Sequence, residues 1–205
     1  MRVLILAAVM VVVGLASLGS ATAVDQIVGF GFQSSGAVGQ PNEFYELAFP
    51  ALTGEATVQF EQFRGKVVLI TNVASACGYT ASNYEQLIEL KKGHPDELEI
   101  VLIPSNDFGE QEPGAAGEIE QFIRAQGELA KDFVLLEKSK VNGPHQSKLV
   151  EWLKRITKSD GKDIKWNFET KFFVSKNGQL VSRYSDSFSP IKLKPTVEYF
   201  LKQEL

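Results

Sequence analysis

The sequence is poor in the residues that build covalent and metal-bound frameworks. It has one cysteine, Cys77, and two histidines, His94 and His145, among 205 residues. An intramolecular disulfide needs two cysteines, and a zinc site of Cys and His ligands needs about four suitably spaced donors. A disulfide within the chain is therefore excluded, and we expect neither a metal site nor a bound cofactor.

Positively charged residues are fewer than negatively charged ones. Lys and Arg together number 21 against 25 Asp and Glu, which gives a net charge of −4. Proteins that bind nucleic acids carry a basic patch, so we expect no nucleic-acid partner. The hydrophobic fraction of 44% is typical of a globular domain and not of a disordered chain.

The first 23 residues have the pattern of a secretory signal peptide. A basic residue, Arg2, is followed by an apolar run at 3–18 and by the triplet Ala-Thr-Ala at 21–23. The run is shorter than the ~20 residues of a membrane-spanning helix. We predict cleavage after Ala23, which leaves 205 − 23 = 182 residues and no stable membrane insertion. An uncleaved membrane anchor is the alternative.

The last four residues, 202–205, read KQEL and resemble the KDEL retrieval signal of the endoplasmic reticulum. The alternative is that they are the polar end of a final helix. Together with a signal peptide, they predict a protein of the secretory pathway. It would be either retained in the lumen of the endoplasmic reticulum or secreted.

A domain at 42–205 is predicted after a flexible linker at 24–41, which is rich in Gly, Ser and Gln. The continuous apolar runs at 66–73 and 98–104 are typical of buried parallel strands. Between them, Ser82 and Glu85 form a candidate capping box, and Gly93 can end the helix. The three segments predict a right-handed βαβ unit.

The rest of the pattern completes an α/β domain. Helices are predicted at 115–125, at 146–157 and from 194 onward. Strands at 171–175 and 179–184 flank Asn177 and Gly178, which signal a tight hairpin. This order matches a thioredoxin-like fold, with a central mixed β-sheet flanked by helices.

Cys77 lies between a predicted strand and a predicted helix. Ligands of open α/β sheets lie beyond the carboxyl ends of strands, and the amino terminus of a helix favours a thiolate. Position 80 is Thr, so the segment is not C-x-x-C and exchange between two thiols of this chain is excluded. A lone thiolate can attack a peroxide and become a sulfenic acid, which an external thiol must then resolve. The alternative is a buried, inert cysteine.

Three ordered stretches carry a resemblance to a known family. They are 72–80 (NVASACGYT), 104–114 (PSNDFGEQEPG) and 164–168 (IKWNF). They resemble the motifs of the glutathione peroxidases, and the likeness spans about 44 to 203. It implies an antioxidant peroxidase acting on hydrogen peroxide and on organic or lipid hydroperoxides. Glutathione, or a protein dithiol of the disulfide-isomerase or thioredoxin type, would be the reductant.

The resemblance also implies four catalytic residues. Cys77 would be the peroxidatic residue, in the place that selenocysteine occupies in some members. Gln111 and Asn167 would supply side-chain amides, and Trp166 would supply its indole N–H. Such neutral donors can stabilise a thiolate and a developing oxyanion without adding titratable groups.

The chain departs from the family pattern in several places. Ser105 and Asp107 stand where a cysteine and a glutamine are common, and the third motif is one residue longer than usual. Asp107 would oppose ionisation of the thiol if it lay near Cys77, and would matter little if it faced solvent. The resolving cysteine of thioredoxin-dependent members is absent from 114–138, which favours a cycle with one cysteine.

The stretch from Val141 to Trp152 is short and lacks the insertion that resembles the assembly loop of tetrameric members. We therefore expect a monomer whose site is open to bulky lipid hydroperoxides. A non-catalytic thioredoxin-fold binding module of the secretory pathway remains an alternative. A one-cysteine peroxiredoxin is a weaker one, because Ala74 stands where its Thr-x-x-Cys pattern needs a threonine.

Overall fold

The computed structural model describes residues 33–203 of the chain. The described part contains a six-stranded sheet with the order β1-β8-β7-β4-β5-β6 and a two-stranded sheet of β2 and β3. The strands are Gln33–Val38 (β1), Ala48–Pro50 (β2), Thr57–Gln59 (β3), Val67–Val73 (β4), Leu98–Pro104 (β5), Val134–Leu135 (β6), Lys171–Val174 (β7) and Leu180–Ser185 (β8).

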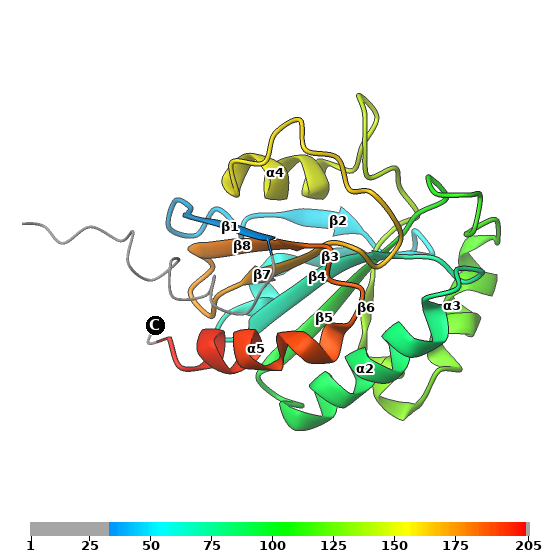
Figure 1. Cartoon of the computed structure of the whole chain (residues 1–205), viewed down its shortest axis with the longest axis horizontal. Helices are drawn as coiled ribbons and strands as arrows, with labels where there is room; N and C mark the ends of the chain where they lie inside the picture. The colour runs from blue at the N-terminus through cyan, green and yellow to red at the C-terminus, as the bar shows by residue number, and fades with distance from the viewer. Residues whose placement is uncertain (1–32, 204–205) are drawn as a thin grey trace, which may run out of the picture.

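Helices cover both faces of the larger sheet. The α-helices are Thr80–Gly93 (α2), Ala116–Arg124 (α3), Lys148–Ile156 (α4) and Lys194–Leu201 (α5). Short 3-10 helices lie at Phe60–Phe63 (η2), Glu128–Asp132 (η3) and Pro190–Leu193 (η4). Figure 1 shows α2, α3 and α5 on one side of the sheet and α4 on the other. The three layers confirm the predicted thioredoxin-like architecture. Over residues 33–203, no helix has the length and apolar character needed to cross a membrane.

Two parallel strands form the centre of the sheet. All seven residues of β4 and all seven of β5 are buried, as expected for strands covered on both faces. Their registers place Asn72 opposite Ile103 and Val73 opposite Pro104. The loops that leave the two strands therefore start side by side, and one of them carries Cys77.

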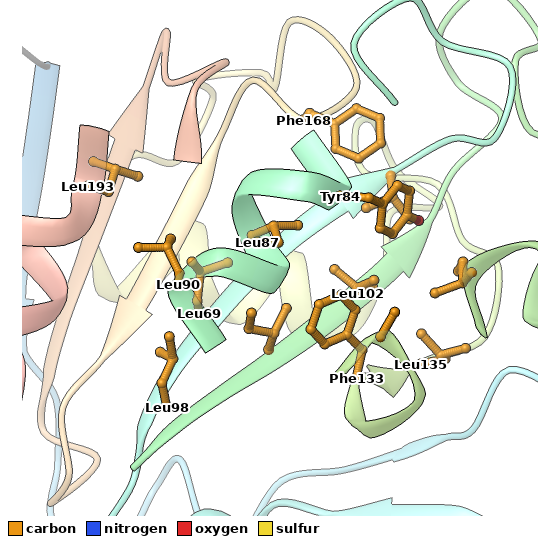
Figure 2. Close-up of a cluster of buried hydrophobic side chains, with 14 of the residues drawn as sticks. Leu69, Tyr84, Leu87, Leu90, Leu98, Leu102, Phe133, Leu135, Phe168 and Leu193 are labelled. Atoms are coloured by element: carbon orange, nitrogen blue, oxygen red, sulfur yellow. The ribbon is translucent and has the colours of Figure 1, made fainter. Parts of the chain in front are cut away.

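One hydrophobic core fills the space between the sheet and α2. Figure 2 shows Leu87 and Leu90 of α2 above Leu69 and Leu102 of the sheet, with Tyr84 at the end near the functional motifs. Burial of each large apolar side chain contributes about 1.5–3 kcal/mol. This core confirms that a helix follows the first buried strand, and it packs α2 against the sheet.

The predicted start of α2 was wrong by three residues. The helix begins at Thr80, and the expected capping box of Ser82 and Glu85 does not form, because Ser82 Oγ donates to the carbonyl of Tyr79 instead. Thr80 N–H donates to the Cys77 carbonyl at 3.0 Å. Thr80 Oγ1 donates to the carbonyl of Ala74 at 2.7 Å. These bonds turn the chain directly from β4 through Cys77 into the helix.

The linker predicted at 24–41 was wrong over 33–38. These residues form β1, which pairs antiparallel with β8 from Gln33 opposite Ser185 to Val38 opposite Leu180. An edge strand obtains its stability from backbone bonds to its neighbour, so the polar sequence QSSGAV needs no apolar alternation. Residues 24–32 lie outside the described residues, as do the predicted signal peptide and positions 204 and 205.

The predicted hairpin is confirmed between β7 and β8. Gly178 has a φ of 72°, and a Cβ atom placed there would lie 2.8 Å from Cε2 of Tyr45. Tyr45 is held in place because its hydroxyl donates to the Lys176 carbonyl at 2.5 Å. Glycine is therefore required at 178 for its backbone conformation and for this close approach.

We predict that Gly178→Ala lowers the free energy of unfolding by about 3 kcal/mol. About 1 kcal/mol comes from a left-handed alanine, and about 2 kcal/mol comes from overpacking against Tyr45. Gly161→Ala is the matched control, because Gly161 has a φ of 73° and no atom within 4 Å of the added Cβ. It should cost only about 1 kcal/mol in urea denaturation. Equal losses in the two variants would contradict the role of Tyr45.

Candidate active site

Cys77 occupies the predicted position between the carboxyl end of β4 and the first turn of α2. Its side chain is buried, with 7% of its surface exposed. The residues on either side of it, Ala76 and Gly78, are exposed. The thiol thus lies just below the surface, in a segment that solvent reaches from both sides.

Gln111 and Asn167 meet next to the segment that carries Cys77. The N–H of Ala76 donates to the Gln111 carbonyl at 3.0 Å. The Asn167 side chain donates from Nδ2 to Oε1 of Gln111 at 3.1 Å. Three stretches far apart in sequence are joined by these two bonds, and two of the three predicted donors are in direct contact.

Asn72 attaches the third motif to the central strand. Its Nδ2 donates to Oδ1 of Asn167 at 3.3 Å, and its carbonyl accepts from the N–H of Phe168 at 3.0 Å. Asn72 is only 2% exposed, so these bonds satisfy polar groups that would otherwise be buried without partners. Sequence analysis assigned it no role, although an Asn within an apolar strand was a usable signal.

Trp166 lies at the rim of the site, whereas Asn167 is fully buried. The Trp166 side chain is 36% exposed, and its ring centroid lies 5.7 Å from that of Phe108. A second pair, Tyr79 and Phe188, is stacked at 4.5 Å at the start of α2. The segments around Cys77 therefore present aromatic surface to solvent.

Phe168 has an unusual backbone conformation directly after Asn167. Its φ is 62°, a left-handed value that costs a bulky residue about 1–2 kcal/mol. The fully buried ring is held edge-on to Tyr84, with centroids 5.8 Å apart. This packing holds the turn that carries the chain from Asn167 to β7.

A buried lysine ties three segments of the site together. Lys171 is fully buried, and its Nζ donates to Oδ1 of Asn83 at 3.2 Å and to the carbonyls of Phe168 and Ser187. Asn83 in turn donates to the carbonyls of Tyr79 and Phe188, each at 3.0 Å. Sequence analysis missed this group; a lysine at the head of an apolar strand was the available signal.

Burial lowers the pKa of Lys171 to about 7, because the interior solvates its charged form poorly. The Glu169 carboxylate acts in the opposite direction and favours the charged form. The lysine therefore changes its charge near neutral pH.

Asp107 is exposed and accepts a hydrogen bond from the Val141 N–H at 2.8 Å. Of the two alternatives for this departure from the family pattern, the structure favours the one in which Asp107 faces solvent. Ser105 is fully buried, and its N–H donates to the carbonyl of Val73 at 2.9 Å. Among the described residues, no group of three or more His, Cys, Asp or Glu side chains could hold a metal ion.

Comparison with known proteins adds an independent line of observation. The family model for glutathione peroxidase matches residues 44–154. The probable glutathione peroxidase 8 of Arabidopsis thaliana is 40% identical over 167 residues, which cover 80% of this chain and 98% of that protein. The glutathione peroxidase-like peroxiredoxin HYR1 of Saccharomyces cerevisiae is 41% identical over 79% of this chain and 98% of its own length.

Solved structures agree with these sequence matches. The crystal structure of T. cruzi GPX1 is 29% identical, has a TM-score of 0.58 and covers 77% of this chain and 95% of its own. A thiol:disulfide interchange protein of the thioredoxin family from Chlorobium tepidum has a TM-score of 0.57 at 14% identity, over 80% of this chain and 99% of its own. At that identity, the second likeness concerns the fold alone.

We predict that the free energy of unfolding rises with pH above neutrality because of Lys171. Its pKa is about 7 in the folded chain and 10.5 for an ordinary lysine, so the unfolded state binds more protons between these values. Stability should rise across this window by up to about 1.4 kcal/mol per pH unit and lose this gain below pH 7.

Urea denaturation at pH 7, 8, 9 and 10 measures this slope. Lys171→Met should remove the part of this slope that comes from Lys171. Lys165→Met, at an exposed lysine, should leave the slope unchanged. Parallel stability profiles for the wild type and Lys171→Met would show that the buried lysine does not titrate in this range.

Proposed function

The chain belongs to the glutathione peroxidase family and is a thiol-dependent peroxidase, and we propose that Cys77 is the residue that attacks the peroxide. Convergence of the three motifs carries this assignment. The bond from Asn167 to Gln111 and the bond from Ala76 to Gln111 place both amides beside the Cys77 segment.

In the first step, the Cys77 thiolate attacks the terminal oxygen of the hydroperoxide. An S–O bond forms, the O–O bond breaks, and the alkoxide or hydroxide that leaves takes up a proton to become an alcohol or water. Sulfur is oxidised by two electrons to a sulfenic acid, and the peroxide is reduced by the same two electrons.

Gln111, Trp166 and Asn167 stabilise the charge that moves from sulfur to oxygen in this step. Their N–H groups are neutral donors, which act without a protonation change of their own. The direct bond between Gln111 and Asn167 fixes both amides before substrate arrives. Such preorganisation avoids the cost of orienting donors during the reaction.

An external thiol completes the cycle, because the chain has one cysteine. A first thiol condenses with the sulfenic acid and releases water, which leaves a mixed disulfide on Cys77. A second thiol displaces Cys77 from that disulfide. We propose glutathione or a protein dithiol of the disulfide-isomerase or thioredoxin type as this reductant. We also propose a monomer that accepts organic and lipid hydroperoxides in an antioxidant role.

The alternative of a non-catalytic binding module is not favoured. A scaffold has no evident need for a hydrogen-bonded amide pair next to a cysteine, and the relatives at about 40% identity are named as peroxidases. The one-cysteine peroxiredoxin hypothesis needs a threonine hydroxyl at position 74. Only the backbone carbonyl of Ala74 is used here, as acceptor for Thr80.

We predict that hydrogen peroxide causes a fast change in tryptophan fluorescence that depends on Cys77. Stopped-flow mixing should show this transient in the wild type and none in Cys77→Ser. Asn167→Ala should slow it by about ten- to a hundredfold, because one donor to the developing charge is lost.

Trp152→Phe is the control for the source of the signal. Trp152 lies on α4, on the opposite face of the sheet, where its indole donates to Glu43 at 2.9 Å. The transient should survive this change and disappear in Trp166→Phe. A transient that persists in Cys77→Ser, or a rate equal to that of free cysteine, would refute the mechanism.

We further propose that residues 1–23 direct the chain into the secretory pathway and that 202–205 return it to the endoplasmic reticulum. The expected amino terminus after secretion is Val24, which mass spectrometry identifies. Deletion of 202–205 should move the protein from cells to the medium. An intact amino terminus in the membrane fraction would favour the anchor instead, and unchanged retention after the deletion would rule out the retrieval signal.

A further inference from the structure

Glu112 is a buried carboxyl group next to the active site that the scheme above does not use. It follows Gln111 in the chain and is 1% exposed. The hydroxyl of Ser75, two residues before Cys77, donates to Oε1 of Glu112 at 2.6 Å. Its own N–H donates to Oδ1 of Asn106 at 2.8 Å, which fixes the backbone at this position.

Two hydrogen bonds therefore join the Cys77 segment to the second motif. One is the backbone bond from Ala76 to Gln111, and the other is the side-chain bond from Ser75 to Glu112. They lie one and two residues before the cysteine. Loss of either bond would allow the segment to move relative to the Gln111 amide.

The second oxygen of this carboxyl group is buried without a partner. Oε2 of Glu112 accepts no hydrogen bond, although the group borders a hollow of about 260 Å³ beside the Cys77 segment. Residues of this segment, of the Glu112 loop and of α3 line the hollow: Ser75, Ala76, Glu112, Pro113, Glu118 and Phe122. An unpaired buried oxygen is costly and suggests a function beyond packing.

The charged and titratable groups around Glu112 come from three further elements. Tyr84 of α2 interacts with it electrostatically, and burial raises the pKa of this phenol well above 10, so it stays neutral. Glu118 of α3 shares the hollow but is exposed and accepts from the Ala115 N–H. Lys138 donates to the Glu112 carbonyl at 3.4 Å.

Among these effects, burial has the largest influence on the pKa of Glu112. Burial raises the pKa of this carboxyl, while hydrogen bonds from the side chain and the backbone of Ser75 and the charge of Lys138 lower it. The neutral acid is thereby favoured over the range in which an ordinary glutamate is already ionised.

We propose that Glu112 is a positioning residue of the peroxidase reaction, which holds the Cys77 segment in place through Ser75. The proposal rests on the role of Cys77 in the proposed function. Glu112 itself makes no bond to the sulfur. It acts through the fixed position of the segment.

Two consequences separate this role from simple packing. Removal of the Ser75 bond should misplace the cysteine at every pH. Removal of the charge alone, with the bond kept, should leave the cysteine in place. Glu112→Gln makes the second change, because the amide oxygen can still accept from Ser75.

The experiment measures the rate of Cys77 oxidation by hydrogen peroxide and, separately, its alkylation by iodoacetamide from pH 4.5 to 8.5. Ser75→Ala and Glu112→Ala should each slow both reactions about tenfold. The double variant should be no slower than Glu112→Ala, because Glu112→Ala already removes every bond between Ser75 and this carboxyl. Glu112→Gln should react at the wild-type rate, because its amide oxygen still accepts from the Ser75 hydroxyl.

Glu118→Gln is the matched control, because it neutralises the other carboxyl of the same hollow and keeps an acceptor for Ala115. Its oxidation rate and alkylation profile should follow the wild type. Additive losses in the double variant, or a Glu112→Gln rate as low as that of Glu112→Ala, would overturn the proposal.

Alkylation keeps this test separate from the peroxidase assignment, because iodoacetamide needs a thiolate but no peroxide chemistry. Slow oxidation of the wild type together with the expected loss of alkylation rate in Ser75→Ala and Glu112→Ala would refute the proposed function alone. Fast oxidation of the wild type together with equal alkylation rates in all variants would refute the role of Glu112 alone.

Discussion

The buried nitrogen of Lys171 constrains the active site more than any other single group. A buried amine without hydrogen-bond partners costs several kcal/mol, so the fold must supply acceptors. It supplies them from Asn83 on α2 and from the carbonyls of Phe168 and Ser187. Satisfying one side chain thus fixes three segments around the site, and the left-handed turn at Phe168 is held in part by its carbonyl bond to this lysine.

The site separates neutral donors from titratable groups. The amides of Gln111 and Asn167 bond to each other beside the Cys77 segment. Lys171 bonds to the Phe168 carbonyl, next to Asn167, and Glu112 accepts from Ser75. Both titratable groups are buried and act through other residues. A thiolate site can then keep its donors in a constant protonation state while the surrounding charges change with pH.

The sequence was sufficient where a structure depends on local pattern. The strands β4 and β5, the helix between them and the Asn177-Gly178 turn were all predicted, because their burial or backbone geometry selects residue types. β1 was missed, because backbone bonds to β8 hold it and these do not select its side chains. The start of α2 was misplaced, because Thr80 bonds to the carbonyl of Ala74.

The same distinction applies within the site. Resemblance to a family identified Gln111 and Asn167, but composition and spacing alone would not have joined residues 56 positions apart. Lys171 and Glu112 escaped notice for a physical reason. Two of the three acceptors of Lys171 are backbone carbonyls, which every residue carries, and Asn83 lies 88 positions away. Polar groups that are brought together only by the fold produce no periodic pattern in the sequence. They are recognised in the structure, because a buried polar group needs a hydrogen-bond partner.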